Sequence, residues 1–238
     1  DTILAFKTFA DRLPKEKRDK VAYVLHTQPV DGNGTDLPAV VQEICPDLNV
    51  IFSTNKLENK HLNYLYNIAD VTINIASNEG FGLGTCESLM CGTPIIVNVT
   101  GGLQDQCGFK YNGEHITYQD YKEIHSLHDW RKWQDNLLLT HGEWVKPVWP
   151  KTRTLAGSPP TPYIFDDRAD WVEAADAIQY WYDLGKEKRE EYGKLGHEFV
   201  CGDESMQSAR WMCKNFEDHM NTAFEKWTPR NKFEVYKV

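Results

Sequence analysis

Two glutamates that flank a glycine-rich turn have the residue types and spacing to do chemistry. Glu79 precedes the stretch Gly80-Phe81-Gly82-Leu83-Gly84, and Glu87 lies eight positions after Glu79. A turn that leaves a strand and opens a helix presents unpaired backbone N–H groups, which favour a bound anion such as a phosphate, and glycines leave room for that ligand to approach. Carboxylates beside a phosphate need hydrogen-bond donors, which the hydroxyls of a sugar or ribose supply. The combination therefore favours a sugar nucleotide over a bare phosphate.

The segments around this turn are predicted to alternate between strand and helix. A run of β-branched residues at 71–75 predicts a buried strand, and apolar residues at helical spacing predict a helix over 83–90. Gly92-Thr93-Pro94 is predicted to end that helix, because glycine suits a C-cap and proline cannot continue a helix. A strand at 95–97 and a second glycine turn at 100–102 follow. This alternation is typical of an α/β fold with a parallel sheet.

The full pattern resembles the donor-site signature of retaining glycosyltransferases with the GT-B fold (group 1, family 4-like). Beyond the turn and Glu87, the resemblance includes Cys91-Gly92-Thr93-Pro94-Ile95-Ile96 and Gly101-Gly102. It implies that Glu79 contacts the donor sugar, that Glu87 binds the ribose hydroxyls, and that amides of the turn hold the diphosphate. The expected catalytic residues are Glu79, Gly82 and Leu83. The expected donor-binding residues are Asn78, Gly80, Phe81, Gly84, Glu87, Thr54, Asn55 and Lys56.

The expected fold class is α/β, a Rossmann-like doubly wound parallel sheet that forms the C-terminal half of a GT-B fold, with a Trp-rich insertion and C-terminal helices. Residues 1–204 are expected to form the donor-binding domain, with the insertion at about 107–154, and residues 205–238 a C-terminal helical crossover segment. The resemblance implies that the first strand of the domain, its basic loop and the N-terminal acceptor domain are missing. The isolated chain is therefore expected to be incomplete.

The loop with Thr54, Asn55 and Lys56 follows a predicted strand at 48–52. Open α/β sheets bind ligands outside the carboxyl ends of their strands, and by family position this loop flanks the nucleobase. Lys56 is equally well interpreted as a solvated surface lysine. His125 and His128, with Asp129, are spaced like metal ligands, but two histidines three residues apart on a helix are common by chance, and no metal site is expected.

The net charge, the apolar runs and the cysteines argue against several classes of protein. A net charge of −9 over 238 residues argues against a general nucleic-acid binder and against broad attraction to anionic membranes. No apolar run approaches transmembrane length. Six cysteines without a Cys-x-x-Cys pair are interpreted as reduced thiols, which favours a cytoplasmic protein, with peripheral membrane contact through the missing half left open. The sequence has no Asp-x-Asp, the pattern by which many other glycosyltransferases hold a divalent ion on the diphosphate, so metal-independent transfer is expected. The resemblance implies a hexosyltransferase.

The predicted function is retaining glycosyl transfer from a nucleotide-diphosphate sugar, such as a UDP- or GDP-sugar, to an unknown sugar, lipid or protein acceptor. No cofactor is expected. Two alternatives stay open: a sugar-nucleotide epimerase or phosphorylase on the same architecture, or a non-catalytic nucleotide-sugar binding module without its acceptor domain.

Overall fold

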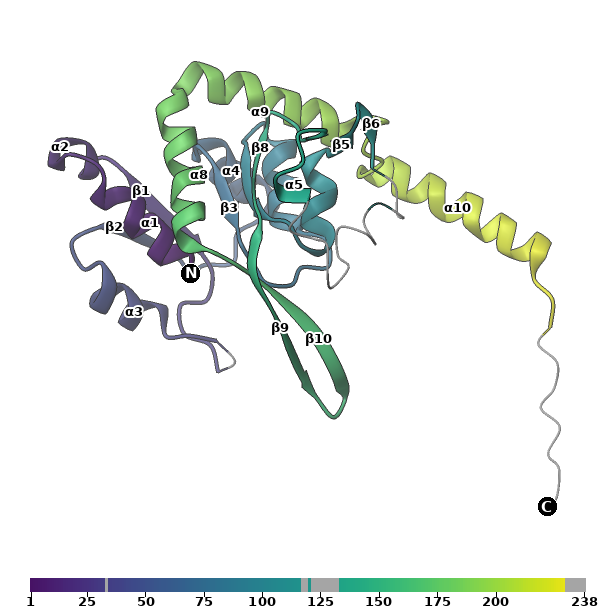
Figure 1. Ribbon diagram of the computed structural model, residues 1–238, viewed down its shortest axis with the longest axis horizontal. Helices are drawn as coiled ribbons and strands as arrows, with labels where there is room; N and C mark the ends of the chain where they lie inside the picture. Colours follow the sequence, from purple (N-terminus) through teal and green to yellow (C-terminus); the bar gives the residue numbers. More distant parts are fainter. Residues whose placement is uncertain (33, 117–119, 121–132, 230–238) are drawn as a thin grey trace.

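Parallel strands occupy the centre of the fold, and helices cover them on both faces (Figure 1). The computed structural model describes residues 1–32, 34–116, 120 and 133–229. One parallel sheet has the order β3-β4-β8, and a second parallel pair is formed by β1 and β2. The bounds of these strands are β1 Ala22–His26, β2 Asn49–Ser53, β3 Thr72–Asn74, β4 Ile95–Asn98 and β8 Val145–Val148.

Strand β4 is fully buried, and its successive residues face opposite layers of helices. Ile95 and Val97 pack with side chains of α5 (Leu83–Met90) and of the 3-10 helix η1 (Gly101–Cys107), whereas Ile96 packs with α1 (Thr2–Asp11) and α8 (Trp171–Leu184). A strand buried on both faces needs the continuous apolar run that the sequence shows. The expected doubly wound α/β fold is therefore confirmed.

Local sequence signals account for the ends of several helices. Asp36 caps α3 (Leu37–Ile44) and Asp170 caps α8 through side-chain hydrogen bonds from backbone amides. Gly92, with a φ of 78°, follows α5 as the C-cap pattern predicts. Apolar residues at 62, 65, 66 and 68 predict a buried stripe on α4 (Asn59–Ile68), but the helix has no buried residue, and Ile68 at its last position is 75% exposed.

The region expected as an insertion, 107–154, is partly regular structure. It contains strand β8 of the central sheet and a small antiparallel sheet of β5 (Lys110–Tyr111), β6 (Glu114–His115) and β7 (Leu139–Thr140). Trp144 and Trp149 pack into the main core. The potential metal ligands His125, His128 and Asp129 lie outside the described residues.

The proline-rich residues 157–162 predict a rigid connector and residues 163–165 predict a short strand, but the structure forms a long antiparallel hairpin there. Strands β9 (Pro150–Ser158) and β10 (Thr161–Ala169) pair along most of their length and project from the body of the protein (Figure 1). The proline-rich stretch forms the tip of the hairpin, where missing N–H groups cost no ladder hydrogen bonds. The short connector expected from proline and glycine content was therefore wrong.

Two helices complete the described chain. Helix α9 (Lys186–Cys201) packs so closely on the end of α5 that a Cβ atom on Gly193 would lie 1.8 Å from the carbonyl oxygen of Gly92. Helix α10 (Ala209–Lys226) extends away from the body and has no buried residue (Figure 1). Its expected role as a crossover segment stays a prediction. Among the described residues, no helix is long and apolar enough to cross a membrane.

Candidate functional site

The turn between β3 and α5 leaves the first amides of α5 without a side-chain cap. Gly82 is the N-cap residue of α5, and as a glycine it has no side chain to accept hydrogen bonds from the first amides of the helix. Gly82 adopts a φ of 88°, a left-handed conformation that favours glycine. The N-terminus of α5 therefore has the uncapped donors and the dipole orientation of an anion site.

The carbonyl groups of the turn are held by protein atoms. The Nε2 atom of the buried Gln106 donates to the carbonyl oxygens of Phe81 at 2.7 Å and Gly82 at 2.9 Å, and the Gly102 amide donates to the carbonyl of Glu79 at 3.1 Å. These bonds fix the carbonyl side of each peptide plane, which also fixes the direction of the N–H groups. The turn is therefore preorganised by the second glycine turn and η1.

The glycines of the turn serve different purposes. A Cβ atom on Gly82 would lie 2.5 Å from Leu103 Cδ2, so this position requires glycine for packing as well as for conformation. A Cβ atom on Gly80 would meet no atom within 4 Å. Only Gly80 therefore fits the expectation that glycine leaves open space for a ligand.

Both candidate glutamates are half-buried and each accepts a hydrogen bond from a neighbouring side chain. The hydroxyl of Tyr66 on α4 donates to Glu87 Oε2 at 3.0 Å, and the amide of Asn74 donates to Glu79 Oε2 at 3.4 Å. Burial, followed by the hydrogen bond to Glu87, raises the pKa of Tyr66, so Tyr66 remains a donor. A carboxylate can accept about four hydrogen bonds, which leaves capacity for ligand hydroxyls.

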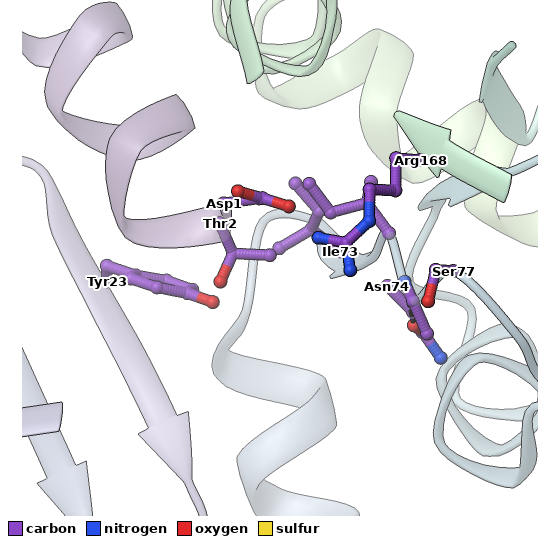
Figure 2. A pocket seen from close by; sticks show the side chains of 9 residues that line it. Asp1, Thr2, Tyr23, Ile73, Asn74, Ser77 and Arg168 are labelled. Atoms are coloured by element: carbon purple, nitrogen blue, oxygen red, sulfur yellow. Dashed lines mark hydrogen bonds between the residues drawn. The ribbon is translucent and has the colours of Figure 1, made fainter. Parts of the chain in front are cut away.

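A cavity of about 400 Å³ lies at the carboxyl end of β3, between β3 and β1 (Figure 2). Its walls include Thr2 and Tyr23 on one side and Asn74 and Ser77 on the other, and Arg168 of β10 extends into it. Asp1 and Thr2, the first two residues of the chain, form part of its wall, so the cavity carries no argument about a ligand. Asn74 connects the cavity to Glu79.

The remaining expected residues occupy separate positions around the turn. Phe81 packs against the core, whereas Leu83 is 70% exposed at the start of α5. Asn78 donates to Asp166 Oδ1 at 2.6 Å, which ties the turn to the hairpin. The structure brings Asn78 to Glu87 together in one strand–turn–helix unit. Gly84 is exposed at the start of α5, and Thr54, Asn55 and Lys56 lie exposed in the loop between β2 and α4; their expected contacts with a donor stay predictions.

Sequence reasoning missed the base of the hairpin as part of the site. The Asp167 amide donates to the carbonyl of Ser77 at 3.0 Å, and its buried carboxylate accepts from Arg153 Nε at 2.5 Å and from Thr100 at 3.0 Å. The acidic pair Asp166-Asp167 was visible in the sequence but was interpreted as a helix-entry loop. The sequence around Tyr66 and Gln106 did not indicate their contacts with the turn and with Glu87, because these contacts span 21 to 25 positions along the chain.

Within residues 1–32, 34–116, 120 and 133–229, no three His, Cys, Asp or Glu side chains gather in a way that could hold a metal ion. All six cysteines lie in this part and are unpaired thiols; Cys45, Cys86 and Cys107 are buried. Metal-independent chemistry stays a prediction.

Known proteins resemble this chain in sequence and in fold. Residues 46–130 match the family model described as glycosyl transferases group 1. D-inositol 3-phosphate glycosyltransferases are 31% identical over 97 residues in Mycobacteroides abscessus and 32% identical over 76 residues in Geodermatophilus obscurus. These matches cover 40% and 31% of this chain but only 20% and 17% of the relatives.

Solved structures extend the likeness over nearly the whole chain, at the level of the fold. Sucrose-phosphate synthase from Thermosynechococcus elongatus has a TM-score of 0.58 at 19% identity and is matched over 94% of this chain and 42% of its own. Anabaena HepE, solved with UDP-glucose, has a TM-score of 0.52 at 11% identity, over 90% of this chain and 44% of its own. The chain thus spans about two fifths of these proteins. These structures show the fold, and together with the family match over residues 46–130 they support a group 1 glycosyltransferase domain with the GT-B fold.

Proposed function

We propose that this chain is the donor-binding part of a retaining glycosyltransferase that uses a nucleotide-diphosphate sugar. The observation that carries the proposal is the uncapped start of α5, preorganised by Gln106 and Gly102 and flanked by Glu79 and Glu87. The fold neighbour solved with UDP-glucose supports a nucleotide-sugar ligand. The curated relatives are named as glycosyltransferases, which favours glycosyl transfer over epimerisation or phosphorolysis.

Each part of the turn has a role in this mechanism. The amides of Gly82 and Leu83 stabilise negative charge that develops on the departing diphosphate when the bond to the anomeric carbon breaks. Glu79 orients the sugar ring, and Glu87 accepts hydrogen bonds from the ribose hydroxyls. The acceptor hydroxyl enters from the leaving-group face, so the configuration at the anomeric carbon is retained. The acceptor binds to a part of the enzyme that this chain does not span.

A thermal-shift panel of UDP- and GDP-sugars tests the donor class. At a ligand concentration of 100 Kd, binding stabilises the folded state by about 2.7 kcal/mol, which corresponds to a rise in Tm of about 5–10 °C for a chain of this size. Absence of a shift with every nucleotide sugar, together with absence of donor hydrolysis, contradicts the proposal. Conversion of a sugar nucleotide to its epimer would support the epimerase alternative instead.

Variants of the two glutamates separate their roles. Glu87→Gln is expected to weaken nucleotide binding by about 1.5–3 kcal/mol, as for a lost charge-assisted hydrogen bond. Glu79→Gln is expected to slow sugar transfer, measured with the acceptor half present, while UDP or GDP binding changes little. Glu225→Gln on the exposed face of α10 is the matched control. A Glu79→Gln enzyme that transfers normally would remove the role assigned to Glu79.

A further inference from the structure

Two consecutive acidic residues near the base of the β9–β10 hairpin bond to both glycine turns of the candidate site (Figure 1). Successive residues of a strand point to opposite faces, so Asp166 and Asp167 reach different neighbours. The Asp167 carboxylate accepts a hydrogen bond at 3.0 Å from Thr100, which precedes the second glycine turn. The Asp166 carboxylate accepts a hydrogen bond at 2.6 Å from Asn78, which precedes Glu79. The hairpin therefore ties the two turns to one strand.

The bond between Asp166 and Asn78 is the stronger of the two polar contacts described for the Asp166 carboxylate. An ionised carboxylate only accepts hydrogen bonds, so the side-chain amide of Asn78 donates. The separation of 2.6 Å is short, as for a charge-assisted bond, and the Asp166 side chain is 18% exposed. Asp166 also pairs with Arg168, but Arg168 Nη2 lies 3.5 Å from Asp166 Oδ2 and the Arg168 side chain is 58% exposed. An exposed ion pair of that length contributes little.

Three consecutive residues that lead into the first glycine turn are each held by a hydrogen bond. The carbonyl of Ser77 accepts from the Asp167 amide at 3.0 Å, and the carbonyl of Glu79 accepts from the Gly102 amide at 3.1 Å. Asn78 lies between them and is held through its side chain by the hairpin. Strand β10 therefore fixes the backbone immediately before Glu79, on the side opposite to the bond from Gly102.

We propose that Asp166 is a positioning residue that acts on the donor sugar through Asn78 and Glu79. The inference rests on the proposed function, in which Glu79 orients the sugar ring. The bond that Asn74 donates to the Glu79 carboxylate is long, at 3.4 Å, so the place of this carboxylate depends on the backbone that carries it. A group that contacts a substrate needs such support, because a displacement of about 1 Å can cost a factor of about 100 in rate.

Isothermal titration calorimetry of the full chain with UDP-glucose and GDP-mannose, and with UDP and GDP as sugar-free counterparts, tests the inference. Asp166→Ala is expected to weaken binding of the sugar nucleotide about threefold to tenfold. The affinity for UDP or GDP is expected to change by less than about twofold, because Glu87 and the amides of α5 hold the nucleotide in the proposed function. Asp218→Ala on the exposed face of α10 is the matched control.

Three combined variants show whether the effect passes through Asn78 and Glu79. Asn78→Ala and Asp166→Ala together are expected to weaken sugar-nucleotide binding no more than either change alone, since both break the same bond. Asn78→Asp combined with Asp166→Asn restores the bond with donor and acceptor exchanged, and it is expected to recover most of the affinity. In a Glu79→Gln background, Asp166→Ala is expected to have no further effect. Additive losses would show that Asp166 acts by another route.

The outcomes separate this inference from the proposed function. If the wild-type chain binds a sugar nucleotide and Asp166→Ala binds it equally well, the role of Asp166 is wrong and the proposed function stands. If Asp166→Ala weakens UDP or GDP as much as the sugar nucleotide, the effect is structural and the inference is again wrong. If Glu79→Gln leaves sugar-nucleotide affinity unchanged, Asp166 does not act through Glu79 and the inference fails. If the wild-type chain binds neither sugar nucleotide, both proposals fail.

Discussion

Substitution of Gly102 by alanine is expected to disturb the candidate donor site through its backbone. A Cβ atom at Gly102 would lie 2.5 Å from both the carbonyl oxygen of Gly80 and the Cα atom of Phe81, and 3.0 Å from the Phe81 amide nitrogen. Because these atoms belong to the backbone of the turn, no side-chain rotation relieves the contact. Overpacking of this kind costs about 1–3 kcal/mol of folding free energy. The turn, or η1 beneath it, must shift.

Scanning calorimetry measures this cost. For a domain of this size, 1 kcal/mol lowers the Tm by about 2–4 °C, so Gly102→Ala is expected to lower it by about 2–12 °C. Gly80→Ala is the matched control, since an added Cβ atom there meets open space. It is expected to leave the Tm unchanged and to weaken UDP or GDP binding, because the ligand needs that space.

Two results would refute this reasoning. A Gly102→Ala protein with wild-type Tm and wild-type nucleotide affinity would show that the two glycine turns do not pack as described. A Gly80→Ala protein with unchanged nucleotide affinity would show that the open side of the turn is not where the ligand lies.

Three further predictions concern other contacts of the site and core. Asp167→Asn is expected to lose about 3–5 kcal/mol of stability in urea titrations, with part restored by adding Arg153→Met; full stability of the single variant would contradict the burial of this ion pair. Burial raises the pKa of Cys86 to about 11, so about one thiol in a thousand is ionised at pH 8, and alkylation followed by mass spectrometry should modify the exposed Cys201 long before Cys86. Equal alkylation of Cys86 and Cys201 would contradict the burial of Cys86. Tyr66→Phe is expected to weaken UDP or GDP binding about threefold by releasing Glu87, and unchanged affinity in calorimetry would rule out this positioning role.

The central strand–turn–helix unit was predictable because its signals are local. The β-branched residues of β3 and β4, the glycines of both turns and Pro94 each restrict the backbone over a few residues. The helix cap at Asp170 was predictable for the same reason, since its side chain bonds to an amide two residues away.

The contacts that complete the site depend on tertiary structure and had no local signal. The Tyr66–Glu87 bond joins two helices, and the bond between Asn78 and Asp166 spans 88 positions. The hairpin was obscured because proline and glycine at its tip also suit a connector, and because Leu155 and Tyr163 are exposed rather than part of a buried strand.

The central claim is that the first amides of α5 hold the diphosphate, and ¹⁵N-glycine NMR tests it most directly. With 16 glycines in the chain, the signals of Gly82 and Gly84 can be assigned by substitution and followed during titration with UDP or GDP. The account predicts saturable shifts of these two amides, while Gly113 and Gly185, which lie outside this turn, remain unchanged. Saturable nucleotide binding that leaves Gly82 and Gly84 unmoved would contradict it.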